Sequence, residues 1–177
     1  AVSARPADEE NSYMPAFLAG RSAAAAIAAS RRVPLIETTH QRGHIRAALI
    51  GNEALLAKDR FLALHLSGGT TDLLTVTLGR GRVASVARLG RSADLHAGQF
   101  VDRVGVRLGL PFPCGKHLEQ LAAKAAETGL RIPSSVRGMN CSFSGAETQA
   151  GRLIESGADR AATAFAVYGC LARTVEK

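Results

Sequence analysis

The stretch 60-RFLALHLSGGTTDLLTVTLGRGRVASVARLGRS-92 decides the fold of this chain. Apolar and polar residues alternate along it, which is the period of a strand that is buried on one face. Two breaks interrupt the alternation, one at Gly68-Gly69 and one at Gly79-Arg80-Gly81. Glycine favours such breaks because it adopts the backbone angles of tight turns without steric cost. The stretch therefore predicts three antiparallel strands joined by two short turns.

Helical patterns lie on both sides of this stretch. Residues 15–32 are rich in alanine and carry Pro15 in the first turn, and residues 34–39 predict a short strand that leads into a helix-forming segment. The apolar period predicts further helices over 100–110, 116–129, 144–157 and 159–177, with Gly129 as a C-cap and a loop over 130–140. Strands and helices in this order predict an α/β or α+β protein.

The composition is globular and strongly basic. Hydrophobic residues make up 46% of the chain, and 18 arginines against 4 lysines contribute to a formal net charge of +7. Arginine makes bidentate contacts with phosphate, so an RNA partner fits this excess, although a genome rich in arginine codons would produce it as well. We expect any RNA contact to involve a group of arginines near residue 40, namely Arg31, Arg32, Arg42 and Arg46.

Location is indicated by what the sequence does not contain. No apolar run approaches the roughly 18 residues of a membrane helix, so we expect no membrane association. Residues 8–10 are acidic, where a signal peptide would be cationic. The three cysteines form no CxxC pair, which favours a reducing compartment. These features together predict a cytoplasmic protein.

His40 and His44 are candidate metal ligands in the segment THQRGHIRAAL, residues 39–49. Residues four apart lie on one face of a helix, so both imidazoles can reach one ion, and neutral imidazole suits zinc or iron. The pair supplies only two ligands, and no glutamate follows His40 as it does in the zincin motif. Two interpretations stay open: half of a metal site, or two surface histidines.

The segment LHLSGGTTDLL contains a candidate phosphate site. Paired glycines between two strands can aim backbone N–H groups at an anion, and the hydroxyls of Ser67, Thr70 and Thr71 can add donors. The alternative is a plain hairpin turn, in which Gly-Gly is common.

A third candidate is the face formed by Gly98, Asp102, Gly105 and Gly109, which recur at helical spacing. Each glycine in a helix costs roughly 1 kcal/mol relative to alanine, so close approach of a backbone or a ligand should compensate. Asp102 could hold ribose hydroxyls, or it could cap a neighbouring helix. Gly115, in PFPCGKH, exposes backbone where the next helix begins, and helix N-termini favour anions.

Four segments together resemble one family: HQRGH, LSGGTTDLL, AGQFVDRVGVRLGLPFPCGKHLEQLA and CSFSGAETQAGRL. They are similar to the successive signatures of the tRNA N6-adenosine threonylcarbamoyltransferase family, formerly called O-sialoglycoprotein endopeptidase or glycoprotease. The resemblance implies an α/β, actin-like ATPase fold, as in Hsp70 and sugar kinases, with a mixed sheet, flanking helices and two lobes around a nucleotide cleft. Residues 1–177 would then be a partial domain, comprising the end of the first lobe and the start of the second. The opening strands and the C-terminal nucleotide and metal motifs would be absent.

The resemblance also implies an activity for the intact protein. It is the transfer of threonylcarbamoyl from threonylcarbamoyl-AMP to an adenine N6 of tRNA, with sister subunits of the same system as partners and a homo- or heterodimer as a possible assembly. His40 and His44 match two ligands of a divalent iron or zinc ion, whose third ligand lies outside this chain. Positions matching the adenine-nucleotide site (threonylcarbamoyl-AMP or ATP) are Leu66, Ser67, Gly68, Gly69, Thr70, Asp102 and Gly115.

Four positions depart from the family pattern. Thr70 stands where members usually carry histidine, Leu95 replaces the second of two aspartates, Gln99 replaces glutamate, and Glu147 replaces lysine. These changes favour an alternative, a non-catalytic homologue that binds a nucleotide or a partner. The matches at the histidines, Asp102 and Gly115 favour the enzyme. A metallopeptidase is the least supported, because no general base accompanies the histidine pair. We expect the chain alone to be inactive in transfer and to bind metal weakly or not at all.

Overall fold

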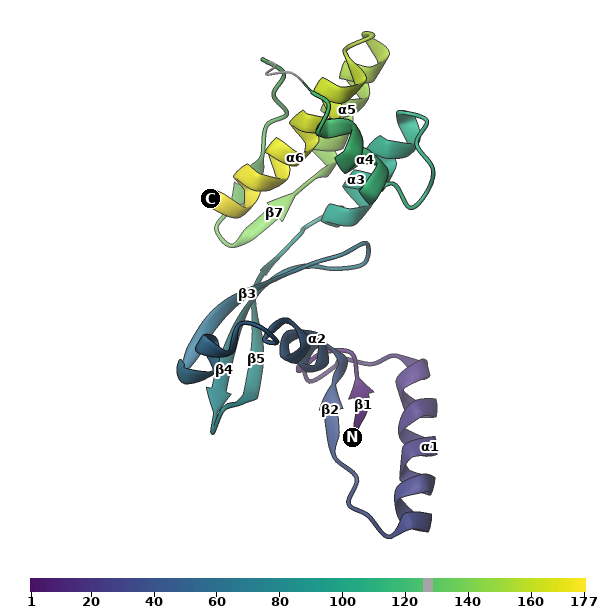
Figure 1. Cartoon of the computed structure of the whole chain (residues 1–177), viewed down its shortest axis with the longest axis vertical. Helices are drawn as coiled ribbons and strands as arrows, with labels where there is room; N and C mark the ends of the chain where they lie inside the picture. The colour runs from purple at the N-terminus through teal and green to yellow at the C-terminus, as the bar shows by residue number, and fades with distance from the viewer. Residues whose placement is uncertain (126–128) are drawn as a thin grey trace. The chain divides into compact units, whose positions relative to one another are not determined.

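A computed structural model describes residues 1–125 and 129–177 as short sheets alternating with helices (Figure 1). In chain order the elements are β1 (Val2–Arg5), α1 (Pro15–Arg31), β2 (Glu37–Thr39), α2 (His40–Ala48), the 3-10 helix η1 (Glu53–Ala57), β3 (Arg60–Leu66), β4 (Thr71–Gly79), β5 (Arg82–Arg91), α3 (Ala97–Arg107), α4 (Gly115–Ala122), β6 (Ser135–Arg137), β7 (Asn140–Ser142), α5 (Ser144–Glu155) and α6 (Arg160–Glu176). The prediction of a mixed α/β protein is confirmed. Within these described ranges, every helix is too short or too polar to cross a membrane.

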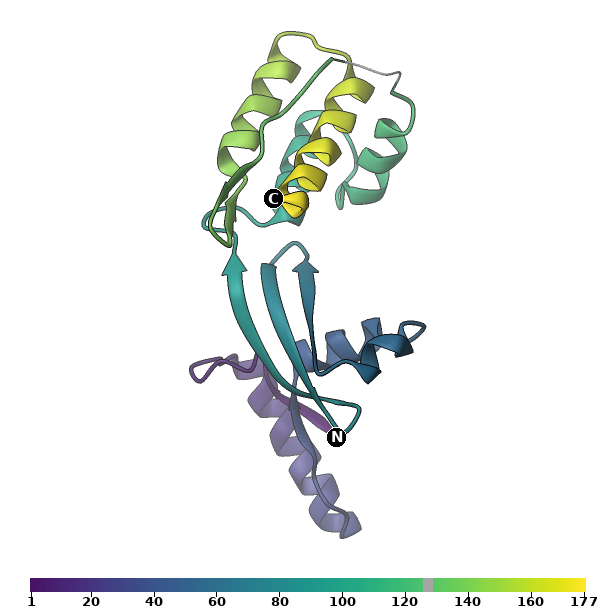
Figure 2. The same cartoon turned by 90° about the vertical axis from the view of Figure 1, so that its left-hand side faces the viewer.

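The three strands predicted for residues 60–92 are present, and they lie side by side in the order β3-β4-β5 (Figure 2). Both connections fall at the predicted glycine breaks. In the second, Arg80 and Gly81 have φ of 51° and 70°, the left-handed geometry that suits a two-residue hairpin loop. Parallel neighbours need a crossover connection of about a dozen or more residues, and both connections here are much shorter, so adjacent strands are antiparallel.

The chain divides into two compact units. The first comprises residues 1–63 and 74–88, and the second comprises residues 64–73 and 89–177. In the first unit, β1 and β2 pair in parallel, with Val2 opposite Glu37, and α1 packs against β1. The core of this unit is aliphatic and is formed by Ile45, Leu49, Leu74, Val76 and Val86.

The second unit is mainly helical. Helices α3, α4, α5 and α6 pack around a larger core that contains Phe100, Leu118, Phe143 and Val167. The rings of Phe100 and Phe143 stack with centroids 5.6 Å apart, which joins α3 to the residue that precedes α5.

The strand predicted over residues 34–39 begins only at Glu37, and three predicted helix boundaries are wrong by three residues or more. Helix α3 begins at Ala97 rather than at residue 100, and it ends before Gly109, whose φ of 71° closes the helix. Helix α4 ends at Ala122, so Gly129 is not its C-cap, and residues 126–128 of the expected helix lie outside the described residues. Ala122 is also the last fully buried residue of α4. Ala123 and Lys124, which follow it, are exposed, so extending the helix through them would bring no further core contact.

Residues 135–142 form a hairpin instead of the expected loop. Strands β6 and β7 are antiparallel, and Gly138 turns between them with φ of 58°. The hairpin is held from outside, because Asn140 Oδ1 accepts from the amide of Arg91 at 3.0 Å and Ser92 bridges to Cys141. Three-residue strands have no recognisable pattern of their own, so this pairing depends on tertiary contact.

Candidate metal and nucleotide sites

The two histidines lie on one exposed face of α2, as predicted. Their Nε2 atoms are 2.9 Å apart, and the ring centroids are 4.4 Å apart at an interplanar angle of 80°. Two imidazoles on one tetrahedral zinc ion have their nitrogens about 3.3 Å apart, given Zn–N distances of about 2.0–2.1 Å. A small ring rotation would therefore bring the pair to ligand geometry, and the donor set fits zinc or iron.

The surroundings of the pair supply no third ligand among the described residues. The ring of Phe17 lies 5.6 Å from His40, which gives the pair an apolar neighbour on one side. Within residues 1–125 and 129–177, no group of three His, Cys, Asp or Glu side chains is placed to hold a metal ion. Among the residues that the structure describes, His40 and His44 are therefore the pair that remains a candidate for holding a metal ion.

Asp8 supports the N-terminus of α2. Both of its oxygens lie 2.8 Å from Arg42 Nε, and one also accepts from the Thr39 hydroxyl at 3.0 Å. The second oxygen accepts from the amide of Val86 on β5 at 2.9 Å. Burial by itself raises the pKa of the Asp8 carboxyl, but the hydrogen bonds from Arg42, Val86 and Thr39 outweigh it and hold the pKa below its ordinary value. Sequence reasoning missed this contact, because its partners are 31 to 78 residues away.

The other predicted site residues all belong to the second unit, beginning with the glycine turn. Leu66 ends β3, and the turn closes with a hydrogen bond from the Ser67 amide to the Thr70 carbonyl at 2.8 Å. The Ser67 hydroxyl accepts from the amide of Gly69 at 3.2 Å, so it is used inside the turn. The Thr71 hydroxyl oxygen accepts from the amide of Ala97 at 2.8 Å. The turn is therefore joined to the first residues of α3.

The glycines of α3 are explained by close approach. A Cβ added at Gly98 would lie 2.7 Å from the backbone nitrogen of Gly68, and one at Gly105 would lie 2.3 Å from Cys114 Cβ. At both positions the lost helical propensity is compensated by the contact that the missing side chain permits. Close approach of another segment, one of the two expected explanations, is thus what the structure shows.

Asp102 has a partner on one of its two oxygens. Oδ1 accepts from the amide of Cys114 at 2.8 Å, just before α4 begins at Gly115. This is the capping contact that sequence reasoning kept as an alternative. The side chain is partly exposed, and within the described residues its second oxygen has no hydrogen bond. The Gly115 carbonyl accepts from the Tyr168 hydroxyl at 3.0 Å, which ties the same turn to α6.

Two of the four departures from the family pattern, Gln99 and Glu147, have side-chain partners in the structure. The Gln99 side chain accepts from the amide of His96, the reciprocal bond of a capping box, where glutamine serves as well as glutamate. Asp94 accepts from the amide of Phe143 at 2.8 Å and from the Ser144 hydroxyl at 2.5 Å, so it caps α5. Glu147 pairs with Arg107 at 2.9 Å. Gln99 and Glu147 are therefore accommodated within the second unit itself.

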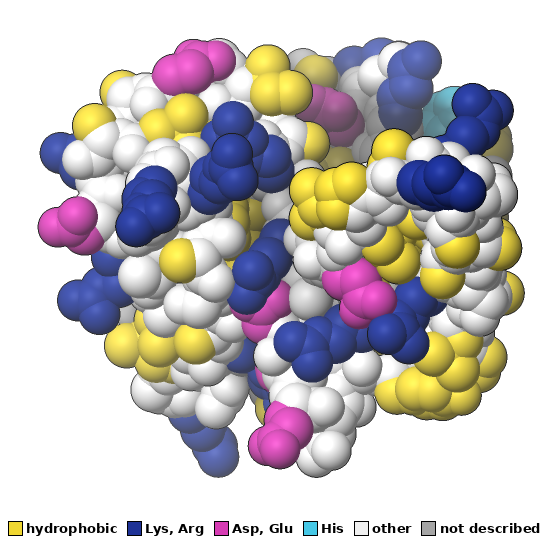
Figure 3. Space-filling view, turned by 90° about the horizontal axis from the view of Figure 1, so that it is seen from below, with side chains coloured by type: hydrophobic (Ala, Val, Ile, Leu, Met, Phe, Trp, Pro, Cys, Tyr) yellow, Lys and Arg dark blue, Asp and Glu magenta, His cyan; other side chains and the backbone are white. Residues whose placement is uncertain are grey.

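The arginines expected to contact RNA are not equivalent. Arg42 is held by Asp8 with an Nη2–Oδ2 distance of 2.6 Å, and its side chain is 31% exposed, so it is not a free surface cation. Arg31, Arg32 and Arg46 are exposed. Figure 3 shows basic side chains spread among apolar and a few acidic ones on the face that it draws. The structure leaves three of the four arginines as candidates.

Fold and sites together define a class: a mixed α/β protein with a two-histidine helix, and a glycine turn joined to the start of a helix that carries an acidic side chain. Comparison with known proteins identifies the family. The family model for tRNA N6-adenosine threonylcarbamoyltransferase matches residues 13–175. The chain belongs to this family, and the resemblance inferred from the four segments is confirmed.

Relatives from archaea and bacteria agree with this result. A probable bifunctional tRNA threonylcarbamoyladenosine biosynthesis protein of Methanothermobacter thermautotrophicus is 37% identical over 153 residues, which cover 86% of this chain and 27% of the relative. The tRNA N6-adenosine threonylcarbamoyltransferases of Geobacter metallireducens and Dehalococcoides mccartyi are each 37% identical, over 75% and 80% of this chain and 38% and 42% of their own lengths. The chain thus spans between about a quarter and two fifths of these curated relatives.

Proposed function

We propose that this chain supplies the metal helix and part of the nucleotide site of a tRNA N6-adenosine threonylcarbamoyltransferase with the actin-like ATPase fold. The reaction is transfer of the threonylcarbamoyl group from threonylcarbamoyl-AMP to the N6 amine of an adenine in tRNA, in the cytoplasm and together with sister subunits. The observation that carries the proposal is the convergence of the His40 and His44 Nε2 atoms, 2.9 Å apart, in a chain of this family.

The roles follow from the chemistry of each group. His40 and His44 would hold a divalent iron or zinc ion, which when bound supplies a Lewis acid for the acyl carbonyl. The backbone of residues 67–70 would lie against the nucleotide phosphate, and the second oxygen of Asp102 is available to accept from a ribose hydroxyl. Holding both reactants in one geometry supplies much of the rate in such transfers.

The second candidate is a homologue that binds nucleotide or partner without catalysing transfer. It is favoured by Leu95, which replaces a carboxylate next to Asp94, and by the use of Asp102 Oδ1 as a cap. The two candidates differ in one respect that can be measured. The enzyme forms threonylcarbamoyladenosine in tRNA, whereas the non-catalytic homologue binds the nucleotide and leaves the tRNA unchanged.

His44→Ala in the complete protein should abolish transfer. We expect metal affinity and threonylcarbamoyladenosine formation to fall by more than about 100-fold, since removing a ligand costs more than removing its supporting residue. Metal content is measured by mass spectrometry of the purified protein, and the product by nucleoside analysis of tRNA. His117→Ala, outside α2, is the matched control and should retain both. Transfer that survives in His44→Ala, or metal lost equally in the control, would refute the metal role.

Asp102→Asn should separate nucleotide binding from capping. Asparagine keeps an acceptor for the amide of Cys114 and removes the charge, so we expect adenine-nucleotide affinity to fall about tenfold while the melting temperature changes by less than about 2 °C. Asp102→Ala removes the cap as well, so it should lower both the adenine-nucleotide affinity and the melting temperature. Calorimetric titration with AMP and thermal unfolding measure the two effects. If Asp102→Asn destabilises the protein and leaves binding unchanged, Asp102 is a cap and nothing more.

A further inference from the structure

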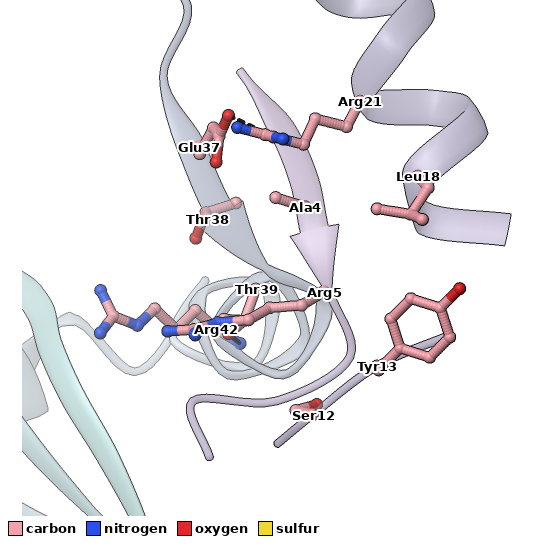
Figure 4. Close-up of a pocket in the computed structure, with 10 residues that line it drawn as sticks. All are labelled: Ala4, Arg5, Ser12, Tyr13, Leu18, Arg21, Glu37, Thr38, Thr39 and Arg42. Carbon is pink, nitrogen blue, oxygen red and sulfur yellow. Dashed lines mark hydrogen bonds and ion pairs between the residues drawn. The ribbon is translucent and has the colours of Figure 1, made fainter. Parts of the chain in front are cut away.

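A polar pocket of about 490 Å³ lies in the first unit (Figure 4). Residues of β1, the loop before α1, α1, β2 and the start of α2 line it. Figure 4 shows Arg21 reaching from α1 across to Glu37 on β2, while Arg5 and Arg42 gather near Thr39 at the ends of the strands. Small-molecule sites commonly have about 300–1,000 Å³, and in α/β sheets they form at the carboxyl ends of parallel strands such as β1 and β2.

The charges around this pocket do not balance. Arg21 Nε pairs with Glu37 Oε1 at 2.6 Å, and Arg42 pairs with Asp8, which is not one of the lining residues. The Arg5 side chain has no hydrogen bond or ion pair with any residue that the structure describes. Three arginines thus face two carboxylates, both of them engaged, and one positive charge is left over.

The neutral groups of the lining suit a phosphate-bearing ligand. Ser12 and Thr38 place hydroxyls on the wall, and such groups can donate to an anion. A guanidinium without a protein partner presents a fork of N–H donors that matches phosphate oxygens. Tyr13 is 67% exposed at the same pocket, so its ring can cover a planar base.

We propose that this pocket binds the phosphate group of a nucleotide, with Arg5 as its principal contact and Tyr13 against the base. The phosphate can belong to a free mononucleotide or to an RNA strand, and both present the same group to Arg5. None of the residues that line this pocket was predicted for the nucleotide site, and Asp102 belongs to the other unit.

The test uses inorganic phosphate, AMP and a single-stranded RNA as probes, titrated by calorimetry against the complete protein. Arg5→Gln should weaken the binding of inorganic phosphate and of AMP about tenfold or more. The melting temperature should not change, because the Arg5 side chain has no partner among the described residues. Tyr13→Ala should weaken the binding of AMP and leave the binding of inorganic phosphate unchanged. Arg82→Gln, an exposed arginine on β5, is the matched control and should bind as the parent does.

The variants and probes together distinguish a free nucleotide from an RNA strand, and binding at this pocket from binding at Asp102. Loss of AMP binding in Arg5→Gln identifies a free nucleotide as ligand, and loss of RNA binding alone identifies an RNA phosphate. AMP binding that depends on Asp102 and not on Arg5 would overturn the proposal, as would failure of all three probes to bind in an Arg5-dependent way. An equal loss of binding in Arg82→Gln would show that the effect comes from net charge alone, and it would also overturn the proposal.

Discussion

Asp8→Asn should lower the free energy of unfolding by about 3 kcal/mol, the largest stability effect that we expect from a single polar substitution in this chain. The Asp8 side chain is 8% exposed and accepts from Arg42, Thr39 and Val86 at 2.6–3.0 Å. Asp8 is buried and Arg42 is 31% exposed, so Asp8→Asn leaves a guanidinium that water compensates only in part, and it also loosens three segments at once. Urea unfolding followed by circular dichroism measures the change.

A matched control is available nearby. Glu9 pairs with Arg88 at 2.8 Å, but both side chains are partly exposed, at 46% and 32%, so Glu9→Gln should cost less than about 1 kcal/mol. Adding Arg42→Gln to Asp8→Asn should cost little more than Asp8→Asn alone, because the pair is already broken. If the two losses add in full, or if Asp8→Asn matches Glu9→Gln, the ion pair does not support α2.

Asp94→Ala should destabilise the protein by about 2 kcal/mol, at the upper end for a helix cap. Asp94 accepts from the amides of Leu95, Phe143 and Ser144 at 2.6, 2.8 and 3.2 Å. It also accepts from two hydroxyls, those of Ser144 at 2.5 Å and Ser92 at 3.4 Å. Asp159 caps α6 through a single amide, at 2.7 Å, so Asp159→Ala is the comparison and should cost about 1 kcal/mol. Equal losses in the two variants would show that the additional contacts of Asp94 contribute nothing.

The Asp94 effect should depend on pH with a defined sign. Partial burial raises the pKa of the Asp94 carboxyl, but hydrogen bonds from Ser144, Phe143 and Leu95 outweigh it and hold the pKa below its ordinary value. A depressed folded-state pKa stabilises the fold above the unfolded-state pKa, and this stability is lost as pH falls through the folded-state pKa. The difference in unfolding free energy between the parent and Asp94→Ala should therefore be full at pH 7 and shrink in strong acid. A difference independent of pH would show that the ionised carboxylate is not what caps α5.

Much of the local structure could be predicted from the sequence. Alternation along residues 60–92 and its glycine breaks predicted β3, β4 and β5, because the strand period and the turn residues act within a few positions. The four-residue spacing of His40 and His44 predicted their shared face, since helical geometry alone determines it. The family could also be inferred, because its motifs are short contiguous segments.

The roles of the acidic residues were decided by tertiary structure. Asp94 caps a helix about 50 residues away, and Asp8 binds the amide of Val86, 78 residues away. The local pattern allowed Asp102 to contact ribose or to cap a neighbouring helix, and only the position of Cys114 shows that one oxygen is already used. The end of α4 and the β6–β7 hairpin likewise depend on which surfaces find a core or a neighbouring strand. Periodicity, turns and short motifs act within one segment, so the sequence by itself determined them, whereas hydrogen bonds between distant segments leave no local pattern and exist only once the chain has folded.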